Sequence, residues 1–393
     1  MRLKQRLPPT ERFWDLGKAS LKIALMGTRG IPASYGGFET CVEEVGARLA
    51  ERGHQVTVYS KQFHGAGRVP KYRGMRNIYL PRPQIRGIET LVATAMSIGD
   101  AIFRGYDVHM IFNGANSPLI PLLRVFGKRV VLNTDGLEWQ RDKWGPIAKK
   151  YYRTSEKISA SVCKHLISDS DAIHEYYSNT HHVDSTIIAY GANLPSAYTP
   201  AEIDAVLQEH GLVAGKYFIQ VTRFEPENQP LLCLQSFASL GRSDVKYVLV
   251  GGSKTGTPYM DSISSYGDPH PAMHLPGFIY DKKTLEILMT NSLAYVHGNR
   301  VGGTNPALLQ AMAAGRPVIA ADCVFNREVL GDLGIFFESN DGSLASGMLR
   351  VIGDSDCANA QIESNIQRIK AKYNWDIIAD KYEALFQKIV GHR

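Results

Sequence analysis

The sequence predicts an α/β protein of two domains, each built on a mainly parallel sheet. A chain of 393 residues is long for a single hydrophobic core, so two domains are the expected arrangement. Short apolar runs are followed repeatedly by glycine-rich or polar turns and then by helical patterns, as in a doubly wound sheet. This series occurs twice, and a linker with prolines at 195 and 200 separates its two halves.

Composition and charge limit the classes of function that the chain can have. The chain is 44% hydrophobic and 21% charged, which is typical of a soluble globular enzyme, and its formal net charge is +6. A mild basic excess suits anionic ligands or an anionic membrane face, and no DNA- or RNA-binding motif accompanies it, so nucleic acid is not an expected partner. Five cysteines without a CxxC pair argue against structural zinc and a disulfide framework, and indicate a reducing cytoplasm.

The first domain is predicted over residues 21–196, after a polar tail of residues 1–20 that is not a signal peptide. It opens with a strand over 21–26, a long glycine loop, a helix over 39–51 and a strand over 55–60. Its loop contains the candidate residues Tyr35, Gly36, Gly37 and Phe38. Its glycines do not match GxGxxG, so the loop either closes over a substrate or is a structural turn.

Acids, bases and indoles are concentrated after the predicted strand over 128–132, at the sheet edge where ligands bind in open α/β folds. This segment contains Asp135, Glu138, Trp139, Arg141 and Trp144. Carboxylates accept hydrogen bonds from sugar hydroxyls and indole faces pack on sugar C–H groups, so we expect a sugar site unless the tryptophans are core residues. Asp169 follows the next strand and is expected to contact substrate, unless Asp169 or Asp171 only caps the helix over 172–178.

The second domain is predicted over residues 197–374, with candidate ligand contacts after four successive strands. These candidates are Arg223 and Asn228, then Gly251 and Gly252, then Gly277 and Phe278, then Gly302, Gly303, Thr304 and Asn305. An arginine can hold a diphosphate by a bidentate contact, and the free N–H groups of a helix start attract an anion. Backbone groups beside an aromatic ring suit a nucleotide base. The alternative for each member alone is a surface ion pair or a structural turn.

Together these motifs resemble a retaining glycosyltransferase of family 4, and more narrowly its bacterial rhamnosyltransferase-like branch. The strings that carry the resemblance are GTRGIPASYGGFET at 27–40, NTDGLEW at 133–139, RFEPEN at 223–228 and GGTNPALLQAMAAGRPVIA at 302–320. The resemblance covers residues 22–382 and implies the GT-B fold, in which two Rossmann-like domains face each other across a cleft. It also implies that a C-terminal helix over 375–393 crosses back to the first domain.

The resemblance implies transfer of a hexose or deoxyhexose from a nucleotide sugar to a glycan or lipid-diphosphate-linked acceptor. L-Rhamnose from dTDP-rhamnose is the favoured donor. Arg223 would meet the diphosphate, residues 302–305 would donate amides to it, and Asp135 would polarise the acceptor hydroxyl, with Glu138 and Arg141 orienting the sugar. Gln310 departs from the family, which has a ribose-binding glutamate there, and Asn228 replaces a lysine. Because glutamine still bonds a hydroxyl, we expect weaker ribose binding rather than lost activity.

No metal or other cofactor is expected, because Arg223 and the helix start can stabilise a dTDP or UDP leaving group. The run Asp169-Ser170-Asp171 has the letters of a metal-binding DxD motif, but capping or acceptor contact is favoured. Three alternatives stay open: a transferase using a UDP-sugar, a sugar-nucleotide epimerase, and a weakly active binding paralogue suggested by Gln310.

Any membrane contact is expected at the surface, since no apolar run is long enough to span a bilayer. A basic loop over residues 61–86 precedes an apolar helix over 90–103. Such a pair can rest on anionic lipid or form a solvated edge above the core. The protein is therefore expected in the cytoplasm, with peripheral contact at the inner face of the membrane as an option.

Overall fold

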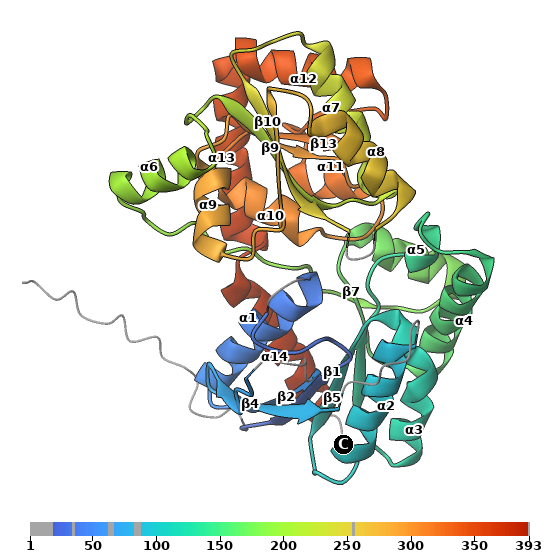
Figure 1. Cartoon of the computed structure of the whole chain (residues 1–393). Coiled ribbons are helices and arrows are strands. Elements are labelled where there is room, and N and C mark those ends of the chain that lie inside the picture. Colours follow the sequence, from blue (N-terminus) through green and yellow to red (C-terminus); the bar gives the residue numbers. More distant parts are fainter. Residues whose placement is uncertain (1–18, 34–35, 62–66, 82–87, 254–255, 392–393) are drawn as a thin grey trace, which may run out of the picture.

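Two sheets organise the computed structural model, which describes residues 19–33, 36–61, 67–81, 88–253 and 256–391. Each sheet forms the centre of one domain, and the domains lie one above the other in Figure 1. The predicted α/β class with two domains is confirmed. The finer boundaries at residues 20, 196 and 374 stay predictions.

The first sheet has eight strands in the order β3-β4-β2-β1-β5-β6-β7-β8. All neighbouring pairs are parallel except the short antiparallel pair β3–β4. The strands are β1 (Lys22–Met26), β2 (Gln55–Lys61), β3 (Lys71–Tyr72), β4 (Met75–Leu80), β5 (Val108–Phe112), β6 (Val130–Asn133), β7 (Leu166–Ser168) and β8 (Thr186–Ile187). A parallel sheet is covered on both faces, which explains why β5 is buried along its whole length.

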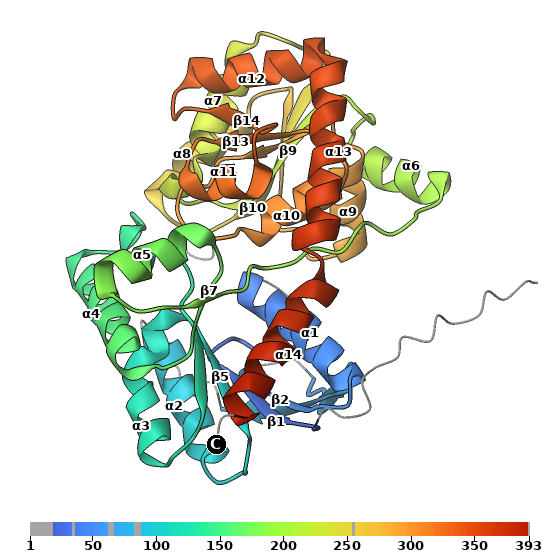
Figure 2. The same cartoon turned by 180° about the vertical axis from the view of Figure 1, so that it is seen from behind.

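Helices form a layer on each face of this sheet (Figures 1 and 2). They are α1 (Gly37–Glu51), α2 (Glu89–Ala101), η1 (Gly114–Leu119), α3 (Ile120–Val125), η2 (Glu138–Gln140), α4 (Pro146–Val162) and α5 (Asp171–His181). Strand side chains alternate between the layers. Ile23 and Leu25 of β1 join the apolar cluster with α1, whereas Ala24 and Met26 join the cluster with α2 and α3.

The second sheet has six parallel strands in the order β11-β10-β9-β12-β13-β14. The strands are β9 (Tyr217–Arg223), β10 (Lys246–Gly252), β11 (Met273–Gly277), β12 (Ala294–His297), β13 (Val318–Ala321) and β14 (Ile335–Phe337). The helices of this domain are α6 (Pro200–Glu209), η3 (Pro226–Asn228), α7 (Pro230–Ser239), α8 (Pro258–Gly267), α9 (Lys282–Thr290), α10 (Pro306–Ala313), α11 (Val324–Leu330), α12 (Asp341–Gly353) and α13 (Ser355–Lys372), and the chain then continues into α14 (Trp375–Gly391). None of the helices in the described ranges is long and apolar enough to cross a membrane.

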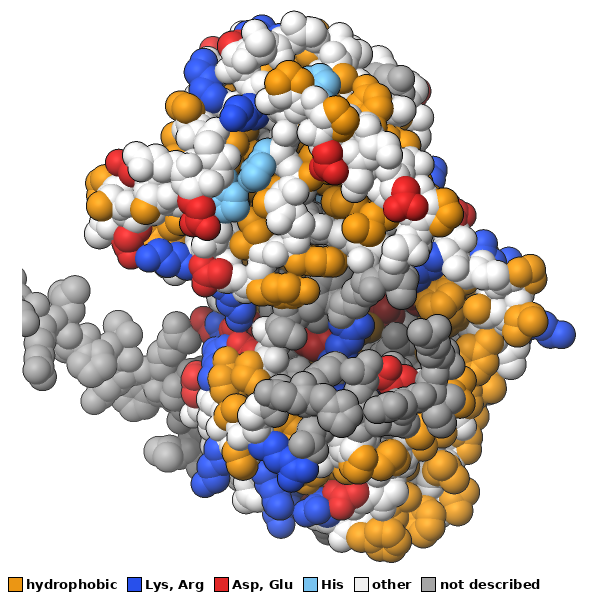
Figure 3. Space-filling model, in the orientation of Figure 1, with side chains coloured by type: hydrophobic (Ala, Val, Ile, Leu, Met, Phe, Trp, Pro, Cys, Tyr) orange, Lys and Arg blue, Asp and Glu red, His pale blue; other side chains and the backbone are white. Residues whose placement is uncertain are grey.

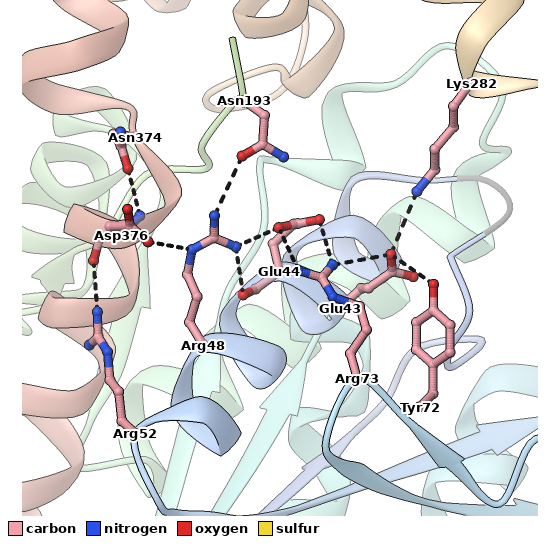
Figure 4. Close-up of polar contacts among 10 residues, drawn as sticks. All are labelled: Glu43, Glu44, Arg48, Arg52, Tyr72, Arg73, Asn193, Lys282, Asn374 and Asp376. Atoms are coloured by element: carbon pink, nitrogen blue, oxygen red, sulfur yellow. Dashed lines mark hydrogen bonds and ion pairs between the residues drawn. The ribbon is translucent and has the colours of Figure 1, made fainter. Parts of the chain in front are cut away.

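The last helix, α14, packs against α1 of the first domain, as Figure 2 shows. Arg48 Nε on α1 lies 2.8 Å from Asp376 Oδ1, and Arg52 Nη1 lies 2.8 Å from Glu383 Oε2. Lys282 Nζ of α9 reaches Glu43 on α1 at 3.5 Å, so a second contact joins the domains near the start of α1. Figure 4 shows these contacts to Asp376 and Glu43. Ion pairs therefore hold α14 on the first domain, and the Lys282–Glu43 contact links the two domains.

Candidate active site

The turn after β12 touches the loops after β6 and β7 of the other domain. A Cβ placed on Gly136 would lie 2.7 Å from the Cα of Gly302, and one on Gly303 would lie 1.7 Å from Oδ1 of Asp169. The Thr304 hydroxyl donates to the backbone carbonyl of Asp169. Only glycine allows backbones to approach this closely. The carboxyl ends of both sheets therefore meet, and the predicted donor and acceptor segments lie together.

The turn over residues 302–304 presents unused hydrogen-bond donors. No hydrogen bond among the described residues uses the amide N–H of Gly302, Gly303 or Thr304. Helix α10 begins directly afterwards, and the Asn305 side chain caps it by accepting from the N–H of Ala307 at 3.0 Å. Gly302 has φ 134°, and a Cβ there would meet no atom within 4 Å. Free amides at an open helix start form an anion site.

Arg223 ends β9 on the same side of the second domain. Its charge lowers the pKa values of the Asp135 and Glu138 carboxyl groups, so the half-buried Arg223 lies near these residues of the first domain. Within the described ranges, no ion pair or side-chain hydrogen bond engages that guanidinium. Buried Asn228 donates to the Arg223 carbonyl at 3.0 Å, so its amide group supports the loop that carries Arg223.

Asp135 follows β6 in a left-handed backbone conformation, with φ 64°. Asn133 holds this conformation because its Oδ1 accepts from the Asp135 N–H at 3.1 Å. The Asn133 amide in turn donates to the Tyr382 hydroxyl of α14 at 3.3 Å. Burial raises the pKa of Asp135 to about 7, and the nearby Glu138 charge adds to the effect. A non-glycine residue held at positive φ with a raised pKa marks a candidate catalytic position.

Tyr382→Phe is expected to lower the transfer rate about two- to thirteenfold, the factor given by one net hydrogen bond of about 0.5–1.5 kcal/mol. The change removes the hydroxyl that orients Asn133 and, through it, Asp135. The donor KM should stay unchanged. Tyr217→Phe is a matched control, because it removes a buried hydroxyl that binds the Leu288 carbonyl in the other domain. Equal rate losses in both variants would show that Tyr382 acts only through stability.

A chain of charged side chains crosses between the domains at Arg141. Its Nε donates to Glu138, and its Nη1 lies 3.8 Å from Oε1 of Glu227 in the second domain. The Trp144 indole also donates to Glu138, at 3.1 Å. Glu227 is fully buried, and neither carboxylate oxygen accepts a hydrogen bond within the described residues. The sequence contains Trp144 and Glu227, but it does not predict that either residue contacts this chain of charged side chains.

Asp169 is 1% exposed, and its Oδ1 has no hydrogen-bond partner among the described residues. Burial raises its pKa well above the usual range, with the charges of Asp135 and Glu328 adding to this. The interpretation of Asp169 as a helix cap is wrong, because Ser170 caps α5 by accepting from the Ile173 N–H. Glu328 of the second domain accepts from the Asp171 N–H at 2.8 Å, a cap across domains that the sequence did not reveal.

Two predicted sugar contacts have packing partners in the first domain. Trp139 donates to Glu156 at 3.1 Å, and the Arg153 guanidinium lies 4.4 Å from its ring centroid. Phe38 packs edge-on to Phe112, with ring centroids 5.7 Å apart. Their roles toward substrate stay predictions.

The glycine loop before α1 reaches the start of α10. A Cβ on Gly37 would lie 2.8 Å from Cγ of Pro306, and Gly36 has φ 113°. Tyr35 lies outside the described residues.

A flat aromatic wall stands beyond β10 and β11. A Cβ on Gly252 would lie 2.8 Å from the Phe278 ring, which stacks on Tyr280 with centroids 5.8 Å apart. Gly277 beside it has φ 76°. Packing within the domain requires glycine at position 251, because a Cβ there would lie 1.8 Å from the Thr222 carbonyl oxygen. This wall suits a nucleotide base.

Comparisons with known proteins agree with this geometry. Residues 204–368 match the family described as "Glycosyl transferases group 1". The protein is a glycosyltransferase. Residues 117–193 of the glycosyltransferase match a family described as "Domain of unknown function (DUF1972)". The narrower rhamnosyltransferase branch is not shown by these matches.

Relatives of the glycosyltransferase match along nearly its whole length. The GDP-mannose-dependent alpha-(1-6)-phosphatidylinositol monomannoside mannosyltransferase of Mycobacterium tuberculosis is 23% identical over 399 residues, covering 91% of this chain and 96% of the relative. Sucrose-phosphate synthase from Thermosynechococcus elongatus superposes with a TM-score of 0.79 at 18% identity, covering 95% of this chain and 100% of that one. Anabaena HepE in complex with UDP gives 0.74 at 14%, covering 94% and 100%. The predicted GT-B fold is confirmed.

Proposed function

We propose that the glycosyltransferase moves a hexose or deoxyhexose from a nucleotide sugar to a glycan or lipid-linked sugar during cell-surface polysaccharide synthesis. L-Rhamnose from dTDP-rhamnose is the favoured donor, on the resemblance of the four sequence motifs. One observation carries the proposal: the amides of residues 302–304 and the Arg223 guanidinium, which have no partner among the described residues, lie near Asp135 and the residue that follows it. This arrangement supports an anion cradle in one domain and a proton acceptor in the other.

In this proposal catalysis acts mainly on the leaving group. The bond from the anomeric carbon to the diphosphate oxygen breaks, and the amides with Arg223 stabilise the negative charge that develops there. The oxygen of the acceptor hydroxyl forms the new bond to the anomeric carbon, and the proton of that hydroxyl passes to the Asp135 carboxylate. Attack from the face that the diphosphate leaves gives retention without an enzymatic nucleophile. Because fixed protein donors supply the charge stabilisation, we propose that no metal is required.

A thermal-shift screen tests the donor assignment. The donor that binds only the folded protein stabilises it by about 2.7 kcal/mol at a concentration of a hundred times Kd. We expect the largest shift with dTDP-rhamnose among dTDP-rhamnose, UDP-glucose, UDP-N-acetylglucosamine and GDP-mannose. A largest shift with a UDP- or GDP-sugar would reassign the donor. Formation of an epimer from the donor alone would instead indicate an epimerase.

Gln310→Glu is expected to lower the donor KM about fivefold, because a charged acceptor bonds a hydroxyl about twice as strongly as a neutral one. Gln310 is exposed on α10, the helix that starts at the amide turn. The rate at saturating donor should stay near that of the wild type. Steady-state kinetics with varied donor measure both quantities. A rise of several orders of magnitude in kcat would identify the natural protein as a weakly active paralogue.

A further inference from the structure

Large apolar side chains are exposed on the α2–α4 side of the first domain. Phe103 is 83% exposed, Leu122 48%, Val125 83% and Phe126 54%. They belong to or directly follow α2 and α3, which both pack on η1. Figure 3 shows hydrophobic side chains gathered at the lower right, where Figure 1 places these helices. Contiguous apolar surface of this kind marks an interaction site, because exposing it to water is unfavourable.

Helix α4 adds exposed lysine side chains on the same side of the first domain. Ile147, Lys150, Tyr151 and Lys157 follow helical spacing and share one exposed face, and Ile147 is 88% exposed. The helix is fixed beside α3, because the Arg124 Nη1 donates to the Val162 carbonyl at 2.6 Å. This contact places the C-terminal end of α4, which follows Lys157, beside α3.

The basic side chains of α4 are available to an outside anion. Lys149, Lys150, Arg153 and Lys157 form no ion pair with any residue that the structure describes. They line a groove of about 630 Å³ that begins at Trp144. Since Trp144 donates to Glu138, this groove adjoins the proposed acceptor side of the cleft.

We propose that the α2–α3–α4 face docks on an anionic lipid bilayer. Phe103, Val125 and Phe126 enter the boundary between headgroups and acyl chains, while the lysines of α4 contact headgroup phosphates. The cleft then opens beside the lipid surface at the Trp144 end of the groove. The surface itself does not depend on the proposed donor or acceptor.

This surface differs from the basic loop over residues 61–86 that the sequence suggested. Arg73 of that loop pairs with Glu44 at 2.8 Å, as Figure 4 shows, and is therefore engaged within the protein. Residues 62–66 and 82–87 of the loop lie outside the described ranges. The proposed docking face therefore lies at the C-terminal end of α2 and on α3 and α4, and does not include the basic loop.

Vesicle co-sedimentation of the full chain without substrate tests the proposal. Wild-type protein should bind vesicles of phosphatidylcholine with phosphatidylglycerol, and bind pure phosphatidylcholine far more weakly. Lys150→Gln with Lys157→Gln should lower the partition coefficient about 25-fold, since each basic residue contributes roughly fivefold at an anionic surface. Val125→Ser with Phe126→Ser should lower it at least tenfold, because each lost apolar side chain weakens insertion.

Matched changes on the second domain serve as controls. Leu349→Ser removes a side chain that is 49% exposed on α12, and Lys370→Gln with Lys372→Gln removes the same charge from α13. Both controls should sediment like the wild type. Absent wild-type binding, or equal losses in the controls, would overturn the proposal. Hydrolysis of the nucleotide sugar by the surface variants is measured without lipid. A wild-type rate shows that lost vesicle binding is separate from any failure of the proposed enzymatic function.

Discussion

Arg223→Ala is expected to lower kcat/KM for the nucleotide sugar about 10²–10³-fold. This loss is typical of removing one preorganised hydrogen-bond donor to an anion that develops in the transition state. Arg223 is half-buried, faces the first domain and has no ion-pair partner in the described part of the chain, so its charge is free for a diphosphate. Titration calorimetry with dTDP and UDP should detect binding to the wild type and none to the variant.

Arg223→Lys provides the matched comparison, because it keeps the charge but loses the bidentate fork. Its activity should lie between those of the wild type and the alanine variant. Arg242→Ala, which removes an exposed pair with Asp244, should behave like the wild type. Unchanged nucleotide affinity in Arg223→Ala would remove this side chain from the donor site.

Asp135→Asn is expected to lower the rate of transfer by about 10²–10⁴-fold, the usual contribution of a general acid or base. Donor affinity should change little, because the proposed anion cradle lies in the other domain. The amide is nearly the same size as the carboxyl group, and the Asn133 contact uses only the backbone N–H of Asp135. Transfer at the wild-type rate by this variant would exclude Asp135 from the mechanism.

The pH profile gives an independent check on Asp135. Its carboxylate form is required in our proposal, so the wild-type rate should rise as pH increases through the pKa of about 7 and level off above it. The raised pKa means that the native state keeps a proton which the unfolded state loses above the ordinary value of 3.8. The free energy of unfolding should therefore fall as pH rises between these values. Both effects should disappear in Asp135→Asn.

Local pattern was enough to predict which residues of the candidate site lie at strand ends. Arg223 and the turn over residues 302–305 each follow a short apolar run, and parallel sheets present such positions at one edge. The predicted α/β fold followed from the same repetition. These features depend on contacts between residues close in the chain, which a single sequence records.

Contacts between distant segments could not be predicted. Tyr382 meets Asn133 across 249 positions, and Glu328 caps a helix in the other domain. The sequence showed a polar side chain at each of these places but not its partner. The misassigned cap at Asp169 has the same cause, since Gly303 and Thr304 of the second domain pack on that residue.

NMR of the protein labelled with ¹⁵N-glycine tests the anion cradle most directly. On addition of dTDP or UDP, the amide resonances of Gly302 and Gly303 should shift and saturate together, because their N–H groups have no acceptor among the described residues. Gly127 and Gly241, which lie in turns after α3 and α7, should not move. Saturable nucleotide binding that leaves Gly302 and Gly303 unshifted would contradict the account.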